Sequence, residues 1–195
     1  VTGLYGTIGI LSAVEQRHTT GRGQHIDMSL LDCATALLAN QNMNFLASGE
    51  SPSRIGNAHP NICPYDVFET SDGHIILAVG NDGQFQRCCD VLDVSFLSSD
   101  ARFETNQARV RNRKDLMPTL SQAIQTWSSG ALLEVLAKNN VPAGPISSIG
   151  ENLDSEHSLG RGLVVEIDGV KGVRTPISFS DAELDLRVGA PALQR

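Results

Sequence analysis

One loop-like stretch of the sequence gathers side chains that could bind a ligand. Residues 54–60 read Arg-Ile-Gly-Asn-Ala-His-Pro, so Gly56, Asn57, Ala58 and His59 could offer backbone amides, a side-chain amide and an imidazole. An imidazole serves as a hydrogen-bond partner or as a general acid or base near neutral pH. Loops carry functional residues out of proportion to their length, although most loop residues have no such role. A ligand site and an ordinary connector therefore explain this segment about equally well.

A second polar group follows an apolar run at residues 75–79. Asn81, Asp82 and Gln84 could line the pocket of a substrate at the point where a strand ends. Asn and Asp also favour the N-cap position of helices, where their side chains accept hydrogen bonds from free backbone amides. Helix capping explains Asn81 or Asp82 about as well as substrate binding does.

A group of cationic residues lies farther along the chain. Guanidinium groups match the geometry of phosphate oxygens, so such a group could bind a phosphate-bearing ligand. Glu104 and Asp115 lie close by in sequence, which favours a solvated helix face with ordinary charge pairing. The residues are Arg102, Arg109, Arg111, Arg113 and Lys114.

Other chemistries find little support in the sequence. Gly21-Arg22-Gly23 lacks the third glycine of a dinucleotide loop and comes after a predicted helix, the reverse of the usual order. No Gly-x-Ser-x-Gly motif is present. The cysteines form no Cys-x-x-Cys pair, so we expect no metal site, and adjacent Cys88 and Cys89 are expected to pack in a core. The four cysteines are Cys33, Cys63, Cys88 and Cys89.

Composition excludes several classes of protein. The 195 residues include 15 Lys and Arg against 22 Asp and Glu, a net charge of −7 without a basic tract, so nucleic acid is an unsuitable partner. The 41% of apolar residues suffices for a folded core. No apolar run approaches the ~20 residues of a membrane-spanning helix, so no membrane partner is expected. Without a secretory signal or a disulfide framework, a reducing, cytoplasmic setting is expected.

Hydrophobic periodicity predicts the elements that position these residues. Two antiparallel strands are expected to meet at an Asp72-Gly73 turn. A helix beginning near Asn81 should place Phe85, Cys88, Cys89 and Leu92 on one face. Ser29 and Ser148 have the spacing of helix caps. Helices are predicted over residues 3–18, 30–46, 106–127 and 131–138, with a short one after Ser148; strands are predicted over 25–28, 65–68, 74–79 and 163–167 and near Val173.

Several short motifs, in order and at consistent spacing, carry a family resemblance that covers almost the whole chain. With them the sequence resembles the C-terminal half of family III CoA-transferases, the group that includes formyl-CoA transferase and carnitine CoA-transferase. The matching motifs are Thr2-Gly3-Leu4-Tyr5, residues 20–32, residues 54–60 with Pro64-Tyr65, Asp72-Gly73, residues 78–85, 100–103, 106–116 and 141–146, and Pro176-Ile177.

The resemblance implies an α+β fold in two parts. Residues 1–48 would end a Rossmann-like large domain, 49–64 would form a linker and active-site loop, 65–170 the small α+β domain, and 171–195 a segment returning toward the large domain. It also implies an interlocked homodimer. Coenzyme A and acyl-CoA would be substrates rather than bound cofactors, and a carboxylic acid would be the acceptor.

The family mechanism that this resemblance implies uses an aspartate that passes through an aspartyl-CoA thioester. That aspartate would precede Thr2-Gly3, so we expect no catalytic residue in the chain, which would be an inactive fragment by itself. Residues 56–59 match a glycine run that shields intermediates in formyl-CoA transferase. Only Gly56 keeps the glycine character, which favours an acyl group other than formyl or oxalyl.

Two alternatives remain open at this point. Related 2-methylacyl-CoA racemases have a Glu-Pro-Gln-Phe stretch where this chain has Asp82-Gly83-Gln84-Phe85. This difference favours the transferase, but only moderately. The chain could also be a non-catalytic dimerisation or binding module.

Overall fold

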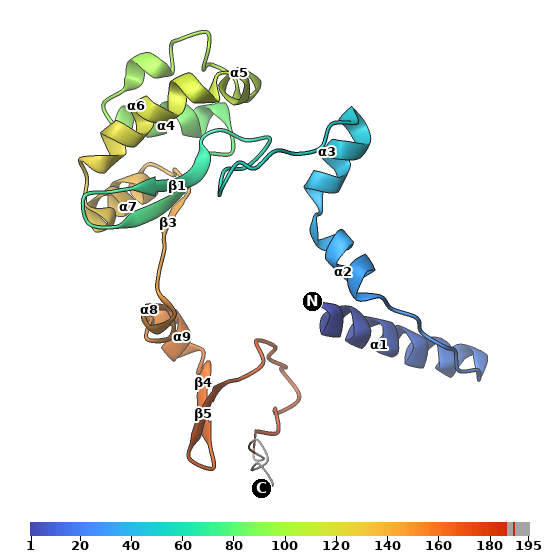
Figure 1. Cartoon of the computed structure of the whole chain (residues 1–195). Helices are drawn as coiled ribbons and strands as arrows, with labels where there is room; N and C mark the ends of the chain where they lie inside the picture. Colours follow the sequence, from blue (N-terminus) through green and yellow to red (C-terminus); the bar gives the residue numbers. More distant parts are fainter. Residues whose placement is uncertain (187–188, 190–195) are drawn as a thin grey trace, which may run out of the picture. The chain divides into compact units, whose positions relative to one another are not determined.

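The structure, a computed structural model, describes residues 1–186 and 189. It divides into two compact units, Val1–Gly56 and Asn57–Arg195 (Figure 1). Within the described residues, no helix has the length and apolar character needed to cross a membrane.

The first unit consists of helices α1 (Thr2–Thr20), α2 (Leu30–Leu37) and α3 (Asn40–Ser48). Ser29 caps α2 as predicted, because its Oγ accepts hydrogen bonds from the amides of Leu31 at 3.1 Å and Asp32 at 3.3 Å. The single helix predicted over 30–46 is wrong. The chain turns at Ala39, which has a φ of 43°, and the Asn42 side-chain amide donates to the Thr35 carbonyl at 2.7 Å where the first helix ends.

The strand predicted over residues 25–28 is also wrong. This extended segment has no sheet partner among the described residues and lies along α1 instead. A Cβ added to Gly6 would come within 3.2 Å of Met28 Cε, and one added to Gly9 within 3.5 Å of Ile26 Cγ2. The alternation of Ile26 and Met28 therefore serves packing on a helix.

The second unit is built on a small antiparallel sheet in the order β1-β2-β3, made of β1 (Tyr65–Glu69), β2 (His74–Ala78) and β3 (Ala143–Pro145). The predicted hairpin is confirmed, but its turn is longer than an Asp-Gly pair. The Thr70 amide donates to the Gly73 carbonyl at 2.9 Å. Strand β3 was not predicted, since Ala-Gly-Pro usually interrupts regular structure and Pro is tolerated in sheets only at edges.

Four helices and a 3-10 turn pack with this sheet. The face predicted for α4 is confirmed, with Phe85, Cys88, Cys89 and Leu92 all buried. The helix predicted over 106–127 is interrupted at Asn112, whose ψ of 24° departs from helical geometry. The elements are α4 (Asp82–Val91), η1 (Ser95–Leu97), α5 (Asn106–Arg111), α6 (Arg113–Gln125) and α7 (Ser129–Lys138).

The hydrophobic core of this unit draws on β1, β2, α4, η1, α6 and α7, and partly buried Val110 of α5 and Ala143 of β3 pack against it. Cys88 and Cys89 lie in it as predicted, and burial raises the pKa of each thiol to about 12, so both stay protonated at neutral pH. The most deeply buried side chains include Phe85, Phe103, Ile75, Leu77, Leu116, Leu120, Leu132 and Leu136.

The last described part contains α8 (Ile149–Leu153), α9 (Glu156–Gly160), β4 (Val164–Ile167) and β5 (Val170–Val173). Ser148 and Glu151 form the predicted capping box, with the Glu151 amide donating to Ser148 Oγ at 3.2 Å and the Ser148 amide to Glu151 Oε2 at 2.7 Å. Strands β4 and β5 form the predicted hairpin around Asp168-Gly169. The predicted α+β class is confirmed.

Candidate functional site

The first contacts that hold the loop of residues 57–63 are made by His59, which belongs to the loop itself. The His59 amide donates to the Tyr65 carbonyl at 2.9 Å, and the imidazole stacks on the Tyr65 ring with centroids 5.3 Å apart. The Asn61 amide donates to His59 Nδ1 at 3.1 Å. These contacts fix both the backbone and the ring orientation of His59.

A second set of bonds reaches the loop from helices α5 and α6. Arg113 Nη2 donates to the His59 carbonyl at 2.6 Å and to the Ile62 carbonyl at 3.2 Å. Asn106 Oδ1 accepts from the Cys63 amide at 3.1 Å, and Arg109 Nε donates to the Cys63 carbonyl at 2.7 Å. We call Asn106, Arg109 and Arg113 the clamp residues.

The clamp residues share one line of side chains at positions i, i+3 and i+7. Residues at this spacing lie on one face of a helix, and the short break at Asn112 leaves all three facing the loop. Asn106 also donates through Nδ2 to the Asn61 carbonyl at 2.9 Å. Four backbone groups of the loop's second half are thus bonded to side chains from this face.

Arg109 connects the loop to the start of α4. Its side chain is fully buried and lies over the Phe85 ring, with Cζ 4.4 Å from the centroid. Its Nη1 donates to the carbonyls of Phe103 and Glu104 at 3.0 and 3.2 Å, and its Nη2 donates to Asp82 Oδ1 at 2.8 Å. A buried guanidinium is tolerated here because each of its nitrogens has an acceptor.

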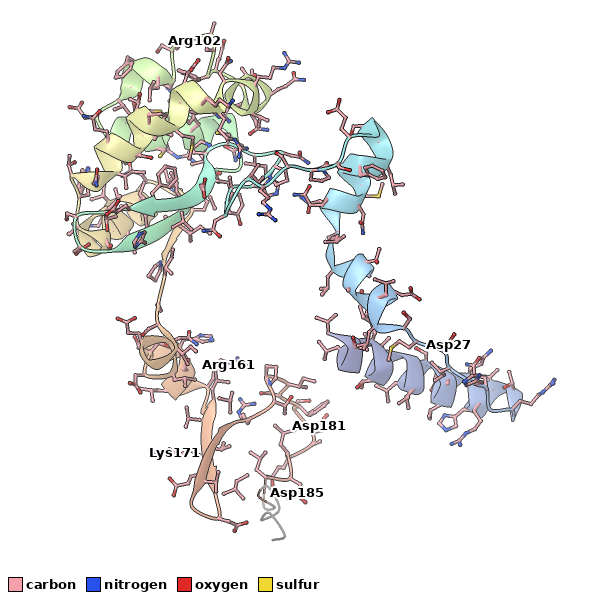
Figure 2. All side chains as sticks on the ribbon, viewed as in Figure 1. Asp27, Arg102, Arg161, Lys171, Asp181 and Asp185 are labelled. Atoms are coloured by element: carbon pink, nitrogen blue, oxygen red, sulfur yellow. The ribbon has the colours of Figure 1, made fainter. Side chains whose placement is uncertain are left out.

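The interpretation of the arginine group is therefore corrected for Arg109 and for Arg113, whose half-buried guanidinium donates to the loop carbonyls of His59 and Ile62. Arg109 belongs neither to a phosphate site nor to a solvated helix face, because its hydrogen-bonding groups are taken by the protein interior. Arg102 does lie on an exposed face at the edge of the helical part (Figure 2), where it pairs with Asp100 at 2.6 Å. The signal that could have separated the two is the i, i+3, i+7 spacing of Asn106, Arg109 and Arg113.

The second predicted polar group has structural partners of its own. Asn81 Oδ1 accepts from the Gln84 amide at 2.9 Å, which is the N-cap bond of α4, and Gln84 Oε1 accepts from the Gly80 amide at 2.7 Å. Asp82 binds Arg109 but is still 56% exposed. Capping accounts for Asn81, while a role of these three residues at a substrate pocket stays a prediction.

The four loop candidates are not equivalent in the structure. Gly56, with a φ of 65°, ends the first unit, whereas Asn57, Ala58 and His59 open the second. Asn57 is exposed, and Ala58 and His59 are half-buried. Arg109 bonds both Cys63 and Asp82, so the end of the loop that carries His59 is connected to the start of α4.

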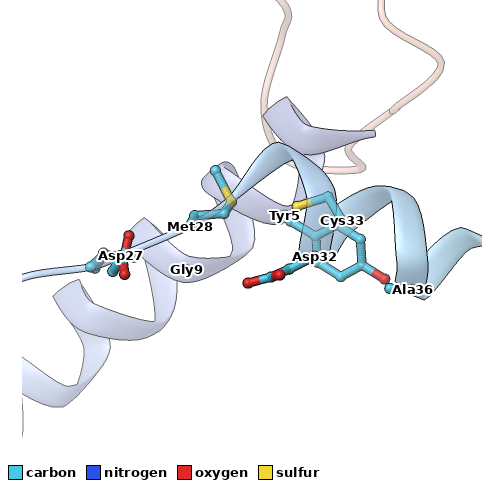
Figure 3. A pocket seen from close by; sticks show the side chains of 8 residues that line it. Tyr5, Gly9, Asp27, Met28, Asp32, Cys33 and Ala36 are labelled. Carbon is cyan, nitrogen blue, oxygen red and sulfur yellow. The ribbon is translucent and has the colours of Figure 1, made fainter.

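The first unit contains a cavity of about 310 Å³ that the sequence did not predict. Its wall is mostly apolar, and the Asp27 and Asp32 carboxylates contribute polar groups to it (Figure 3). The lining residues are Tyr5, Gly9, Ile26, Asp27, Met28, Asp32, Cys33 and Ala36. Among the described residues, no cluster of three or more His, Cys, Asp or Glu side chains is arranged to hold a metal ion.

Comparison with known sequences gives one family. The model of CoA-transferase family III matches residues 1–195. The succinate–glutarate CoA-transferase of Agrobacterium fabrum is 45% identical over 197 residues, covering 98% of this chain and 49% of the relative. The human succinyl-CoA:glutarate CoA-transferase is 35% identical over 167 residues, covering 86% and 38%. The acetyl-CoA:oxalate CoA-transferase of Acetobacter aceti is 34% identical over 192 residues, covering 98% and 49%.

Solved structures agree with the sequence comparison. A crystal structure of a CAIB/BAIF family protein from Brucella suis superimposes with a TM-score of 0.80 at 50% identity, covering 98% of this chain and 51% of that one. The chain thus spans about half the length of the relatives that it matches. Since the family model extends over all 195 residues, the chain belongs to CoA-transferase family III.

Proposed function

We propose that this chain is the C-terminal part of an enzyme that moves coenzyme A between carboxylic acids through an aspartyl-CoA thioester. The observation that carries the proposal is the match of the family model to residues 1–195. The Agrobacterium and human relatives are named for succinate or succinyl-CoA together with glutarate. A dicarboxylic acid is accordingly the first substrate class to test.

The proposed reaction has two symmetrical halves. The aspartate carboxylate attacks the acyl-CoA carbonyl, the C–S bond breaks, and a mixed anhydride and the CoA thiolate result. The thiolate then attacks the aspartyl carbonyl, which releases the donor acid and leaves the aspartyl-CoA thioester. In the second half, the acceptor carboxylate attacks the aspartyl-CoA carbonyl, which releases the CoA thiolate and forms a new mixed anhydride. The thiolate then attacks the acceptor's carbonyl in this anhydride, so that the new acyl-CoA leaves and the aspartate is regenerated.

This chain would contribute the cover of the active site rather than its nucleophile. Gly56, Asn57, Ala58 and His59 would lie over the intermediates, and a cover that excludes water protects anhydrides and thioesters from hydrolysis. The rigid hydrogen bonding of residues 59–63 supports such a role. Asn81, Asp82 and Gln84 would border the acyl pocket.

The same proposal extends to the organisation of the protein. Residues 1–48 would complete the large CoA-binding domain, 49–64 would be the linker and active-site loop, 65–170 the small domain, and 171–195 the return segment. The enzyme would act as an interlocked homodimer in the cytoplasm. The 195-residue chain alone would be inactive.

The decisive experiment uses the longer protein that contains this chain. The enzyme is incubated with succinyl-CoA, quenched without borohydride and analysed by peptide mass spectrometry, which should show CoA attached to an aspartate just before Thr2-Gly3. In a second measurement, isotope-labelled CoA should exchange into the acyl-CoA pool. Replacement of that aspartate by asparagine is the matched control and should abolish both signals. Absence of adduct and of exchange would contradict the proposal. Deuterium entering the acyl α-carbon from solvent would instead identify a racemase.

A further inference from the structure

We propose that Arg113 is a positioning residue for CoA transfer, which holds His59 so that the imidazole Nε2–H donates a hydrogen bond to the reacting acyl group. This inference rests on the proposed function, because it assigns residues 57–63 to the cover of the active site. It adds a role for two side chains to that cover.

The first step is the way Arg113 grips the loop. Its guanidinium donates to the carbonyls of His59 and Ile62, which are 54 and 51 residues away in sequence. These two carbonyls flank the turn that the Asn61 amide closes on His59 Nδ1. A planar guanidinium holds two acceptors in fixed directions, whereas a lysine ammonium acts as a point donor on a flexible stem. Arg113 therefore fixes the shape of the turn that carries His59.

The second step concerns the tautomer of His59, that is, which ring nitrogen carries the proton. Because Nδ1 accepts the Asn61 amide proton, the proton of the neutral imidazole resides on Nε2. The Tyr65 ring stacks on the imidazole and holds its plane. In the part of the chain that the structure describes, Nε2 has no hydrogen-bond partner. The ring thus presents one oriented N–H donor that the protein itself does not use.

The third step connects this donor to the reaction. The anhydride-forming and thioester-forming steps both place negative charge on a carbonyl oxygen, and a preoriented N–H donor stabilises such a charge. A loop that loses its anchor would misplace the donor and admit water to the intermediates. Loss of the Arg113 contacts should consequently lower the transfer rate and divert acyl-CoA to hydrolysis.

The test uses the longer enzyme with Arg113→Lys, and with Arg111→Lys as the matched control. Arg111 is an exposed arginine two positions earlier. Arg113→Lys should lower the kcat of transfer by about 10- to 100-fold, because a misplacement of about 1 Å costs up to about 100-fold. It should also raise the ratio of acyl-CoA hydrolysis to transfer, while Arg111→Lys leaves both unchanged. A purely structural role would lower the unfolding temperature without moving this ratio.

A double-variant experiment decides whether Arg113 acts through His59. His59→Ala should lower kcat by itself, and Arg113→Lys should then cause no further fall in the His59→Ala background. Independent, multiplying effects would overturn the inference, and so would an unchanged kcat and hydrolysis ratio in Arg113→Lys. If Arg113→Lys does not fold, Tyr65→Leu removes the stacking partner and should reproduce the same loss. If the wild-type enzyme transfers CoA normally and these variants do too, only this inference fails; if the wild-type enzyme transfers none, both proposals fail.

Discussion

Arg109 is a charged side chain that works as part of the interior of the second unit. Its guanidinium joins the loop at Cys63, the carbonyls of residues 103 and 104, and the Asp82 carboxylate. Removing such a group leaves several buried acceptors without donors, and each unsatisfied acceptor costs about 1–3 kcal/mol.

Arg109→Met should therefore lower the free energy of unfolding by about 3 kcal/mol. This is the lower end of the cost of removing one partner of a buried ion pair, because Asp82 is partly exposed. The urea concentration at the unfolding midpoint would measure this. Arg102→Met, at an exposed arginine that also pairs with an aspartate, is the control and should change the midpoint little. A similar midpoint for both variants would contradict the assignment of Arg109 to the core.

At the residue scale, the sequence predicted which polar residues could do chemistry better than it predicted which residues they bond to. The sequence identifies Asp82 as a residue able to do chemistry, but the bonds by which Arg109 joins Asp82 to the loop at Cys63 depend on contacts between segments that are distant in sequence. The arginines were weighed as one group by charge. Their spacing relative to Asn106 indicates which arginines face the loop, because only residues on one helix face can reach the same loop.

The turn between β1 and β2 is fastened to the start of α7 by Asp72. Its Oδ1 accepts from the Ser129 amide at 2.7 Å and from Thr70 Oγ1 at 3.2 Å. The hydrogen bond from the Ser129 backbone is the main reason that the pKa of the Asp72 carboxyl lies below its ordinary value.

A carboxyl group whose pKa is lowered by folding adds stability above its unfolded pKa and loses it as the pH falls. We expect Asp72 to contribute fully above about pH 5 and progressively less below about pH 4. Asp72→Asn should accordingly have a flatter stability profile than the wild type as the pH falls from about 5 to below 4, measured by urea unfolding at each pH. An Asp72→Asn profile parallel to that of the wild type would show that the turn makes no such contribution.

At the element scale, periodicity identified helix faces but not helix interruptions. The breaks at Ala39 and Asn112 leave the apolar spacing intact, so the pattern alone joined the pieces on either side. At residues 25–28 the pattern predicted a strand that the structure does not contain. Its alternation is real, but a strand also requires a neighbouring strand, and the segment packs along α1.

The whole molecule exposes apolar side chains on its first helix. Leu4, Ile8 and Leu11 of α1 are 69%, 60% and 63% exposed. Contiguous exposed apolar surface of this kind promotes association. Leu37 of α2 is 58% exposed as well.

The 195-residue chain should self-associate in solution, and sedimentation velocity over a range of concentrations would show this. The double substitution Ile8→Gln with Leu11→Gln should weaken the association without affecting the core of the second unit. A monodisperse monomer at high concentration would contradict the prediction.

The family was predictable at this scale because many weak motifs recur in order, and the family model confirms it over residues 1–195. The acid substrate was not predictable, because relatives that match 98% of this chain are named for different acids, succinate and glutarate in one and oxalate in the other. The sequence indicated fold and chemistry but left the choice of acyl group to experiment.

The buried apolar side chains of the described residues are concentrated between Cys63 and Val141, with Cys33 as the exception. Backbone amides in such a core exchange their protons for deuterium only when the core opens, whereas amides elsewhere exchange through local fluctuations. Deuterium uptake followed by mass spectrometry should therefore be slow in β1, β2, α4 and α6 and fast in α1 and in residues 146–186. The core between Cys63 and Val141, to which the clamp residues belong, would then keep the loop in place while α1 and residues 146–186 exchange freely.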